Sequence, residues 1–396
     1  MTKSPSPSLV LAGLGLTMVA CASWRDAPTT PGSPITPVWE SGSLSCLGLS
    51  KPFFLDPYSV TGGTLVLQGL DTTSTFTSAI GIRTADGTPS WCEPRARLGN
   101  SPFRGDSGFV VFLDYVRSTI VRMRAADGAT MWETPFTPAV GQWTYETGYS
   151  ASAAVTAVAN SEYPSARFET AAFSSVDGRL LWSRIDSTEF RFRPSVRGSV
   201  VIGDTIFTYG TEPLDRNSVR RRLFLHAYAA ATGAPLGRFT SGDSASSTIA
   251  PVAVAGDRLI FSNIEGGLLA MNTRGEVLWR VRGRGIGPRQ SPVILDGVAY
   301  VASADGTVRA VNVATGAQLW VTDLTYSLDG VGVCGTHVYV QMVTDLWRLD
   351  RATGAITGHE ADDPGGVRSR FFGPLMSTPD AVYVGSRGGR IFRLPC

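Results

Sequence analysis

The sequence predicts an all-β fold: an eight-bladed β-propeller of four-stranded antiparallel blades. The first observation is a glycine-containing corner that occurs seven times, at steps of 41, 50, 55, 42, 41 and 38 residues. The second is a tryptophan four residues after five of these corners. The pairs are Gly87/Trp91, Gly128/Trp132, Gly178/Trp182, Gly275/Trp279 and Gly316/Trp320, while Gly233 and Gly354 are followed by Gly237 and Gly358. A period of about 40 residues with tight turns between strands is typical of a propeller blade.

Residues 291–320 show the predicted blade most clearly. Apolar and polar residues alternate through its second and third strands, as expected for a half-buried sheet. We expect strands at 291–294, 298–302 and 308–311 and an outer strand that starts at 318, separated by turns at 296–297, 305–306 and 314–316. The tryptophan of each outer strand is expected to bury its ring between adjacent blades.

Both chain ends carry incomplete units. The C-terminal residues provide strands at 381–384 and 390–394 but no corner after them, and Val38-Trp39-Glu40 resembles an outer strand with no corner before it. We expect the two fragments to share the eighth blade, which removes an open sheet edge. Seven blades is the alternative, if one degenerate unit does not form a blade.

Composition argues against nucleic-acid binding, because charged residues make up 17% of the chain and the net charge is only +2. The fourth unit contains a polar, basic insertion at 211–222. This insertion is expected to be a solvated loop or a partner contact.

The first 20 residues are predicted to be a signal peptide, with an apolar stretch from Leu9 to Val19 that is too short to span a bilayer as a mature helix. Met18-Val19-Ala20-Cys21 resembles a bacterial lipobox, which implies cleavage before Cys21 and lipidation of that cysteine. Two or three acyl chains anchor a protein stably. An ordinary cleaved signal is the alternative. Residues 21–37 are predicted to be a flexible tether and residues 38–396 the propeller.

Four further cysteines are candidates for disulfides in an exported protein. We expect Cys46–Cys92 and Cys334–Cys396, because each pair would link neighbouring blades, with buried free thiols as the alternative. No Cys/His cluster in the sequence suggests a metal site.

The string Ala-Thr-Gly-Ala-Gln-Leu-Trp at 314–320 and its copies resemble the pyrroloquinoline-quinone-like repeat. The repeat occurs in quinone-dependent dehydrogenases and in binding proteins, so it predicts fold rather than chemistry. The dehydrogenases bind a quinone beside a metal ion, often against adjacent cysteines. This chain has no Cys-Cys pair, and His226, His337 and His359 are far apart in sequence. We therefore expect no catalytic residues, no metal and no cofactor.

The second class with this repeat is the lipid-anchored propeller of the outer-membrane β-barrel assembly machinery. The lipobox, short tether, blade number and length all resemble its layout. In that family an apolar-x-apolar-Arg loop docks on a periplasmic domain of the barrel insertase, and Phe190, Phe192 and Arg193 keep that pattern. The alternative is an aromatic inner strand whose arginines face solvent. The family's two acidic positions hold Ser246 and Thr248 here, so the docking geometry is expected to differ.

The resemblance implies a non-enzymatic lipoprotein at the periplasmic face of the outer membrane, with surface exposure as an alternative. It is expected to be a monomeric propeller that holds the barrel insertase and unfolded barrel proteins, and so supports barrel insertion. The second reading is a binding propeller for a glycan or an envelope enzyme, and the third is a quinoprotein dehydrogenase.

Overall fold

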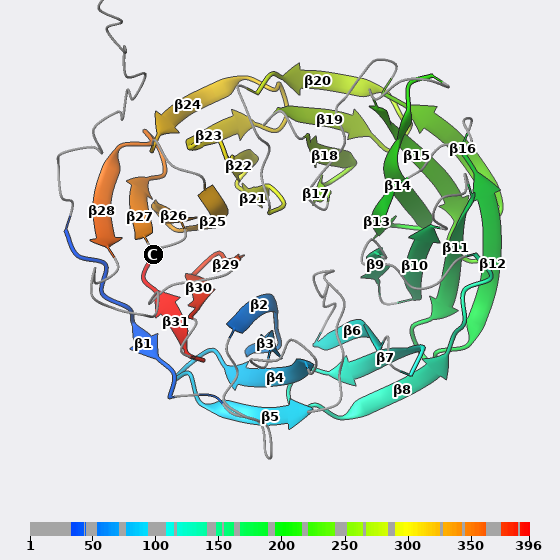
Figure 1. Ribbon diagram of the computed structural model, residues 1–396, viewed down its shortest axis with the longest axis horizontal. Coiled ribbons are helices and arrows are strands. Elements are labelled where there is room, and N and C mark those ends of the chain that lie inside the picture. The colour runs from blue at the N-terminus through cyan, green and yellow to red at the C-terminus, as the bar shows by residue number, and fades with distance from the viewer. Residues whose placement is uncertain are drawn as a thin grey trace, which may run out of the picture.

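The computed structural model is a closed ring of antiparallel sheets arranged radially about one axis (Figure 1). It describes residues 33–42, 44, 54–70, 77–93, 108–114, 117–140, 148–152, 154–161, 167–188, 195–215, 221–241, 252–263, 267–283, 290–324, 328–342, 345–361, 374–386 and 389–396. These residues form 31 strands and no helix, and so contain no helix long and apolar enough to cross a bilayer.

Eight sheets form the ring, which confirms the predicted number of blades. Blades 1 to 4 contain β2 Phe54–Thr61, β3 Thr64–Leu70, β4 Thr77–Arg83 and β5 Pro89–Glu93; β6 Phe109–Asp114, β7 Thr119–Arg124 and β8 Thr130–Pro135; β9 Gly148–Ala151, β10 Val155–Ser161, β11 Arg167–Ser174 and β12 Leu180–Ser187; β13 Ser195–Ile202, β14 Thr205–Pro213, β15 Arg221–Ala229 and β16 Pro235–Thr240. Blades 5 to 8 contain β17 Ala253–Ala255, β18 Arg258–Ser262, β19 Leu268–Asn272 and β20 Val277–Val281; β21 Val293–Leu295, β22 Val298–Ala302, β23 Thr307–Asn312 and β24 Gln318–Asp323; β25 Leu328–Cys334, β26 His337–Met342, β27 Asp345–Asp350 and β28 Ile356–Ala361; β29 Leu375–Thr378, β30 Ala381–Gly385, β31 Ile391–Leu394 and β1 Trp39–Glu40.

Seven of these sheets have four strands, and blade 2 has three among its described residues. Strands alternate in direction, so the connections gather on two opposite faces of the ring. We call the face with the glycine corners the hairpin face. The opposite face, where each blade leads into the next, is called the connection face.

The tryptophans join neighbouring blades through their indole N–H groups. Each donates a hydrogen bond to a backbone carbonyl three residues before the glycine corner of the following blade. The bonds are Trp39 to Thr84 (3.0 Å), Trp91 to Ala125 (2.6 Å), Trp132 to Ser175 (2.9 Å), Trp182 to Ala230 (2.8 Å), Trp279 to Val313 (2.9 Å) and Trp320 to Arg351 (2.9 Å). We call each of these contacts an indole staple.

The corner glycine is required by the staple. Gly316 has a φ of +74°, which L side chains rarely adopt, and a Cβ placed on it would lie 2.6 Å from Cγ of Trp279. The repeat of glycine and tryptophan in the sequence therefore records one contact between blades, made with the glycine of one blade and the tryptophan of the blade before it.

Strand β1 closes the ring by pairing with β31, so that the blue and red ends of the chain share one sheet (Figure 1). Trp39 pairs with Arg393 in the ladder, and the backbone N–H of Ser41 donates to the carbonyl of Ile391 at 2.9 Å. This confirms the predicted composite blade. It ties together segments about 350 residues apart with hydrogen bonds.

The junction between blades 7 and 8 has Gly358 in place of tryptophan and is held in another way. A disulfide joins Cys334 to Cys396 across it. Ser33 pairs with Gly358, and Ile35 is buried in the core between the two blades. Residues 33–37, assigned to the tether from the sequence, thus pack on the propeller. An Ile flanked by Ser, Thr and Pro gives too weak a pattern to be recognised.

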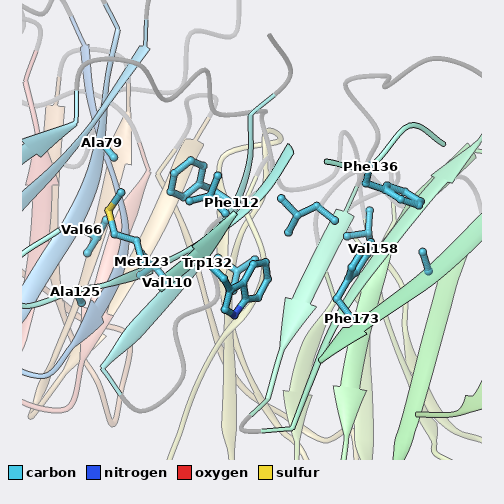
Figure 2. Close-up of a cluster of buried hydrophobic side chains, with 14 residues drawn as sticks. Val66, Ala79, Val110, Phe112, Met123, Ala125, Trp132, Phe136, Val158 and Phe173 are labelled. Atoms are coloured by element: carbon cyan, nitrogen blue, oxygen red, sulfur yellow. The ribbon is translucent and has the colours of Figure 1, made fainter. Parts of the chain in front are cut away.

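The cores lie between adjacent blades. Figure 2 shows one such cluster, in which Val66 of blade 1, Phe112 and Trp132 of blade 2 and Phe173 of blade 3 are all buried. Because every blade is covered on both faces, the middle strands are buried on both sides and not half-buried as the alternation predicted, and they carry buried polar residues such as Thr156 and Asn160. Strand β10, for example, is buried at every position.

Candidate partner-docking surface between blades 3 and 4

The predicted docking residues Phe190, Phe192 and Arg193 lie outside the described residues, in the segment between β12 and β13. The ends of that segment are described. Thr188 is buried directly after β12, and Ser195 begins the inner strand of blade 4, where it pairs with Thr211. The last residue of the outer strand of blade 3 and the first residue of the inner strand of blade 4 both lie at the connection face.

An apolar cluster fills the seam between these two blades. It consists of Ala159, Phe168, Val196 and Phe224, all fully or almost fully buried. The rings of Phe168 and Phe224, from the third strands of the two blades, have centroids 5.4 Å apart. Burial of aromatic rings dominates the energetics of such contacts, so these rings hold blades 3 and 4 together.

His226 continues this cluster toward the hairpin face. Its ring packs edge-on against Phe168, with the centroids 5.0 Å apart. Burial lowers the pKa of His226 to about 4, and the positive charge of Arg238 contributes in the same direction. His226 is therefore a neutral packing residue at neutral pH, because removing a charged imidazolium from water costs free energy.

A polar chain crosses the seam beside His226. The hydroxyl of Tyr228 in blade 4 donates to Oδ2 of Asp186 in blade 3 at 2.9 Å, and Nε of Arg184 lies 3.2 Å from the same oxygen. Burial, together with the nearby Asp186 carboxylate, raises the pKa of Tyr228. The tyrosine stays protonated and holds blade 3 against blade 4.

Glu212 forms the second polar cluster, at the connection-face end of blade 4. Its side chain is fully buried, and it lies 2.9 Å from Nε of Arg222 and 3.0 Å from Nη2 of Arg238. A buried carboxylate is stable only when it is paired and hydrogen-bonded. Of the two guanidinium groups, that of Arg238 reaches the surface, since its side chain is 37% exposed.

This cluster changes the interpretation of the 211–222 insertion. Strands β14 and β15 continue into it, and Glu212 pairs with Arg222 and Pro213 with Arg221 in the ladder. Both ends of the predicted loop are thus sheet. The sequence predicted a loop here because a run of polar residues is typical of loops. In the structure the charged residues pair with each other across a hairpin, which lets them lie in strands.

Blade 3 holds its own entry segment with buried polar side chains. The carboxylate of Glu169 accepts from the backbone N–H groups of Ala139 (2.6 Å) and Val140 (3.1 Å), and the side chain of Asn160 donates to the carbonyl of Val140 at 2.9 Å. These bonds fix the chain where it leaves blade 2. The connection face beside the seam is therefore rigid on both sides.

The remaining predicted site residues are distributed around the chain. Cys21 and Cys46 lie outside the described residues. Cys92 is on β5 and is disulfide-bonded, and Cys334 is bonded to Cys396. Within the described part of the chain, no three His, Cys, Asp or Glu side chains gather in a way that could hold a metal ion.

Comparison with known proteins gives a family match over part of the chain and a shared fold over most of it. The family model for the outer membrane protein assembly factor BamB matches residues 222–337, from β15 to β26. BamB of Alkalilimnicola ehrlichii is 31% identical over 116 residues, which span 26% of this chain and 30% of the relative. The sequence match thus covers less than a third of that relative's length.

Three solved structures share the fold at low identity. The designed protein Ika8 has a TM-score of 0.63 at 12% identity, over 87% of this chain and 97% of its own. BamB from Moraxella catarrhalis has a TM-score of 0.60 at 14% identity, over 91% of this chain and 100% of its own. A quinohemoprotein alcohol dehydrogenase from Comamonas testosteroni has a TM-score of 0.61 at 12% identity, over 91% and 76%.

Sequence reasoning missed the polar contacts of the seam. Glu212 and Arg238 are far apart in sequence, as are Asp186 and Tyr228, and nothing local indicates that the members of either pair meet. The alternation of β15 gave a partial signal, since His226 falls among apolar residues of a strand. In fold along its described length, and in sequence over residues 222–337, the chain is a BamB-like propeller of pyrroloquinoline-quinone-type repeats.

Proposed function

We propose that this chain is a non-enzymatic scaffold that is anchored by lipid at Cys21 to the periplasmic face of the outer membrane. It supports the assembly of outer-membrane β-barrel proteins by binding a periplasmic domain of the barrel insertase. The observation that carries this proposal is the BamB match over residues 222–337, together with a propeller that superposes on the full length of a BamB structure.

The seam between blades 3 and 4 is the proposed docking surface. Phe190, Phe192 and Arg193 belong to the segment that joins these blades, and aromatic residues and arginine are the residue types enriched at interaction hot spots. The seam beneath is packed by Phe168 and Phe224. A rigid base lowers the entropy cost of binding, because less of the surface must become ordered in the complex.

Charge adds direction to this surface. The guanidinium of Arg238 is partly exposed at this surface, so an acidic group on the partner would be favoured there. The acidic pair that the related family uses is replaced by Ser246 and Thr248. We therefore propose that the surface of this chain's partner is more acidic than the surface that the related family's acidic pair contacts.

Co-purification in mild detergent tests the proposal. The tagged protein should bring down the barrel insertase, and the variant Phe190→Ala, Phe192→Ala, Arg193→Ala should recover it at least about tenfold less, because two aromatic anchors and a directed charge are removed. The matched control is Leu319→Ala with Val321→Ala, two exposed apolar residues on β24 far from the seam.

Other outcomes would contradict the proposal. Equal recovery by the triple variant would refute the docking surface, and recovery of only a glycan or an envelope enzyme would refute the insertase as partner. Dye-linked dehydrogenase activity after reconstitution with quinone and calcium would refute the non-enzymatic role. Cys21→Ala should release the protein from membranes, and retention of this variant would refute the lipid anchor.

A further inference from the structure

The junction between blades 4 and 5 lacks an indole staple. Gly237 stands at the tryptophan position of β16, opposite Ala227 in the ladder. The ring of Phe239 turns back over it: a Cβ on Gly237 would lie 2.5 Å from Cζ of Phe239, and one on Gly275 would lie 2.0 Å from Cδ1 of the same ring. A phenyl ring without an N–H group thus lies against the corner where six of the other junctions have an indole.

The carbonyl that would accept the indole hydrogen bond can be identified. In each stapled blade the accepting residue also donates its own backbone N–H to the turn between the first two strands, as Val313 does to Gly297 and Arg351 to Thr336. Thr273 makes the equivalent bond to Asp257. Thr273 therefore takes the place of the acceptor residue, and Phe239 has no donor to offer its carbonyl.

A cavity of about 520 Å³ opens at this junction on the hairpin face. Its wall includes the apolar side chains of Phe207, Leu236 and Phe239, and its rim includes Thr273 and Arg274. The volume is within the range of small-ligand pockets. Leu236 is 58% exposed, the highest value among the exposed leucines of the described outer strands.

We propose that this cavity binds an aromatic side chain with an N–H or O–H donor, tryptophan above all, from a protein partner. The six staples identify the occupant, because each places an indole at the corresponding junction and pairs its N–H with the corresponding carbonyl. The incoming ring packs on Leu236 and Phe239, and its N–H donates to the carbonyl of Thr273. Arg274, at the rim, adds a cation that aromatic faces attract.

This site is independent of the proposed insertase contact. The cavity lies on the hairpin face, whereas the strand ends that flank the segment between β12 and β13 lie at the connection face. One ring can therefore bind two proteins at once, and loss of one contact leaves the other in place.

Fluorine NMR of N-acetyl-fluorotryptophanamide tests the proposal with the full chain. The wild-type protein should broaden and shift the probe signal, and N-acetyl-tryptophanamide should compete whereas N-acetyl-leucinamide should not. Leu236→Ala should weaken binding about tenfold through lost apolar contact. The matched control Leu319→Ala, an exposed leucine that directly precedes a stapled tryptophan, should leave binding unchanged.

A second variant fills the cavity from within. Gly237→Trp with Phe239→Thr recreates the sequence around Trp320, which has Thr322 two residues later, and should abolish probe binding in a protein that remains folded by circular dichroism. Unchanged binding in this variant, equal weakening by Leu236→Ala and Leu319→Ala, or no response of the wild-type protein would each overturn the proposal. If the filled variant does not fold, the two leucine variants decide.

Discussion

Trp320 offers a quantitative test of the indole staple. Its side chain is 8% exposed, its Nε1 lies 2.9 Å from the carbonyl of Arg351, and a Cβ on Gly354 would lie 2.6 Å from its ring. Trp→Ala substitutions in cores cost about 3–5 kcal/mol. We therefore expect Trp320→Ala to lower the free energy of unfolding by about 4 kcal/mol.

Two further variants divide this cost into parts. Trp320→Phe keeps most of the apolar contact but leaves the carbonyl of Arg351 without its donor, which should cost about 1–2 kcal/mol. Gly354→Ala should be destabilising because of its φ of +74° and the clash with the indole. In the double variant with Trp320→Ala the clash with the indole is gone and only that with Oγ1 of Thr322 (2.7 Å) remains, so the two effects should add up to less than their sum.

The assay is urea unfolding followed by circular dichroism, with the slope of the transition checked in every variant. Leu319→Ala is the control. Leu319 is next to Trp320 on the same strand and is 52% exposed, so this substitution should change the free energy of unfolding by no more than about 0.5 kcal/mol. A loss in Trp320→Ala within 1 kcal/mol of this control would refute the staple as a source of stability.

Three other predictions concern the seams of the ring. The pKa of His226 is lowered from 6.5 to about 4, so the unfolded chain takes up a proton first as the pH falls through this window. The free energy of unfolding of the wild-type protein should drop by up to about 3 kcal/mol between pH 7 and pH 4 because of this group. In urea titrations at the two pH values, His226→Phe should show a smaller drop than the wild type. Equal drops would contradict the lowered pKa of His226. Replacing Cys334 and Cys396 by Ala should lower the free energy of unfolding by about 4 kcal/mol, because the disulfide closes a loop of 62 residues. A reductant should destabilise the wild-type protein through this bond, and this contribution should be absent in the variant. Trp39→Ala should raise hydrogen exchange of residues 38–44 more than that of β22, and equal rates would show that this strand does not close the ring.

The repeat made the ring predictable from sequence. The corner glycine occurs seven times, and tryptophan follows it on the next strand five times. Because the same pattern recurs along the chain, its spacing predicts the blades more reliably than any single copy could. In the blade at 291–320, the second strand was predicted at its observed bounds, and the first differs by two residues at its start, because Ser291 and Pro292 precede the ladder. Proline lacks the N–H that a ladder needs.

Features that occur once were harder to predict. The docking of Ile35 depends on a single apolar residue in a polar segment, and Phe239 replaces tryptophan two positions away from the expected place. The ion pair of buried Glu212 with Arg238 joins residues 26 apart, and Glu212 lies in a region that looked like a loop. The candidate docking residues could be named from the sequence because they form a short pattern that resembles a known family. The polar residues around them could not, because they meet through contacts between residues distant in the chain, such as Asp186 and Tyr228.

Hydrogen exchange of the full chain with and without the periplasmic domains of the barrel insertase tests the central claim most directly. The proposed docking surface predicts added protection in peptides that span residues 186–196 and 221–226, at the connection face of blades 3 and 4, and none at the hairpin-face turns of blade 5, residues 256–257 and 273–275. Protection confined to the hairpin face, or no protection at saturating insertase, would contradict the account.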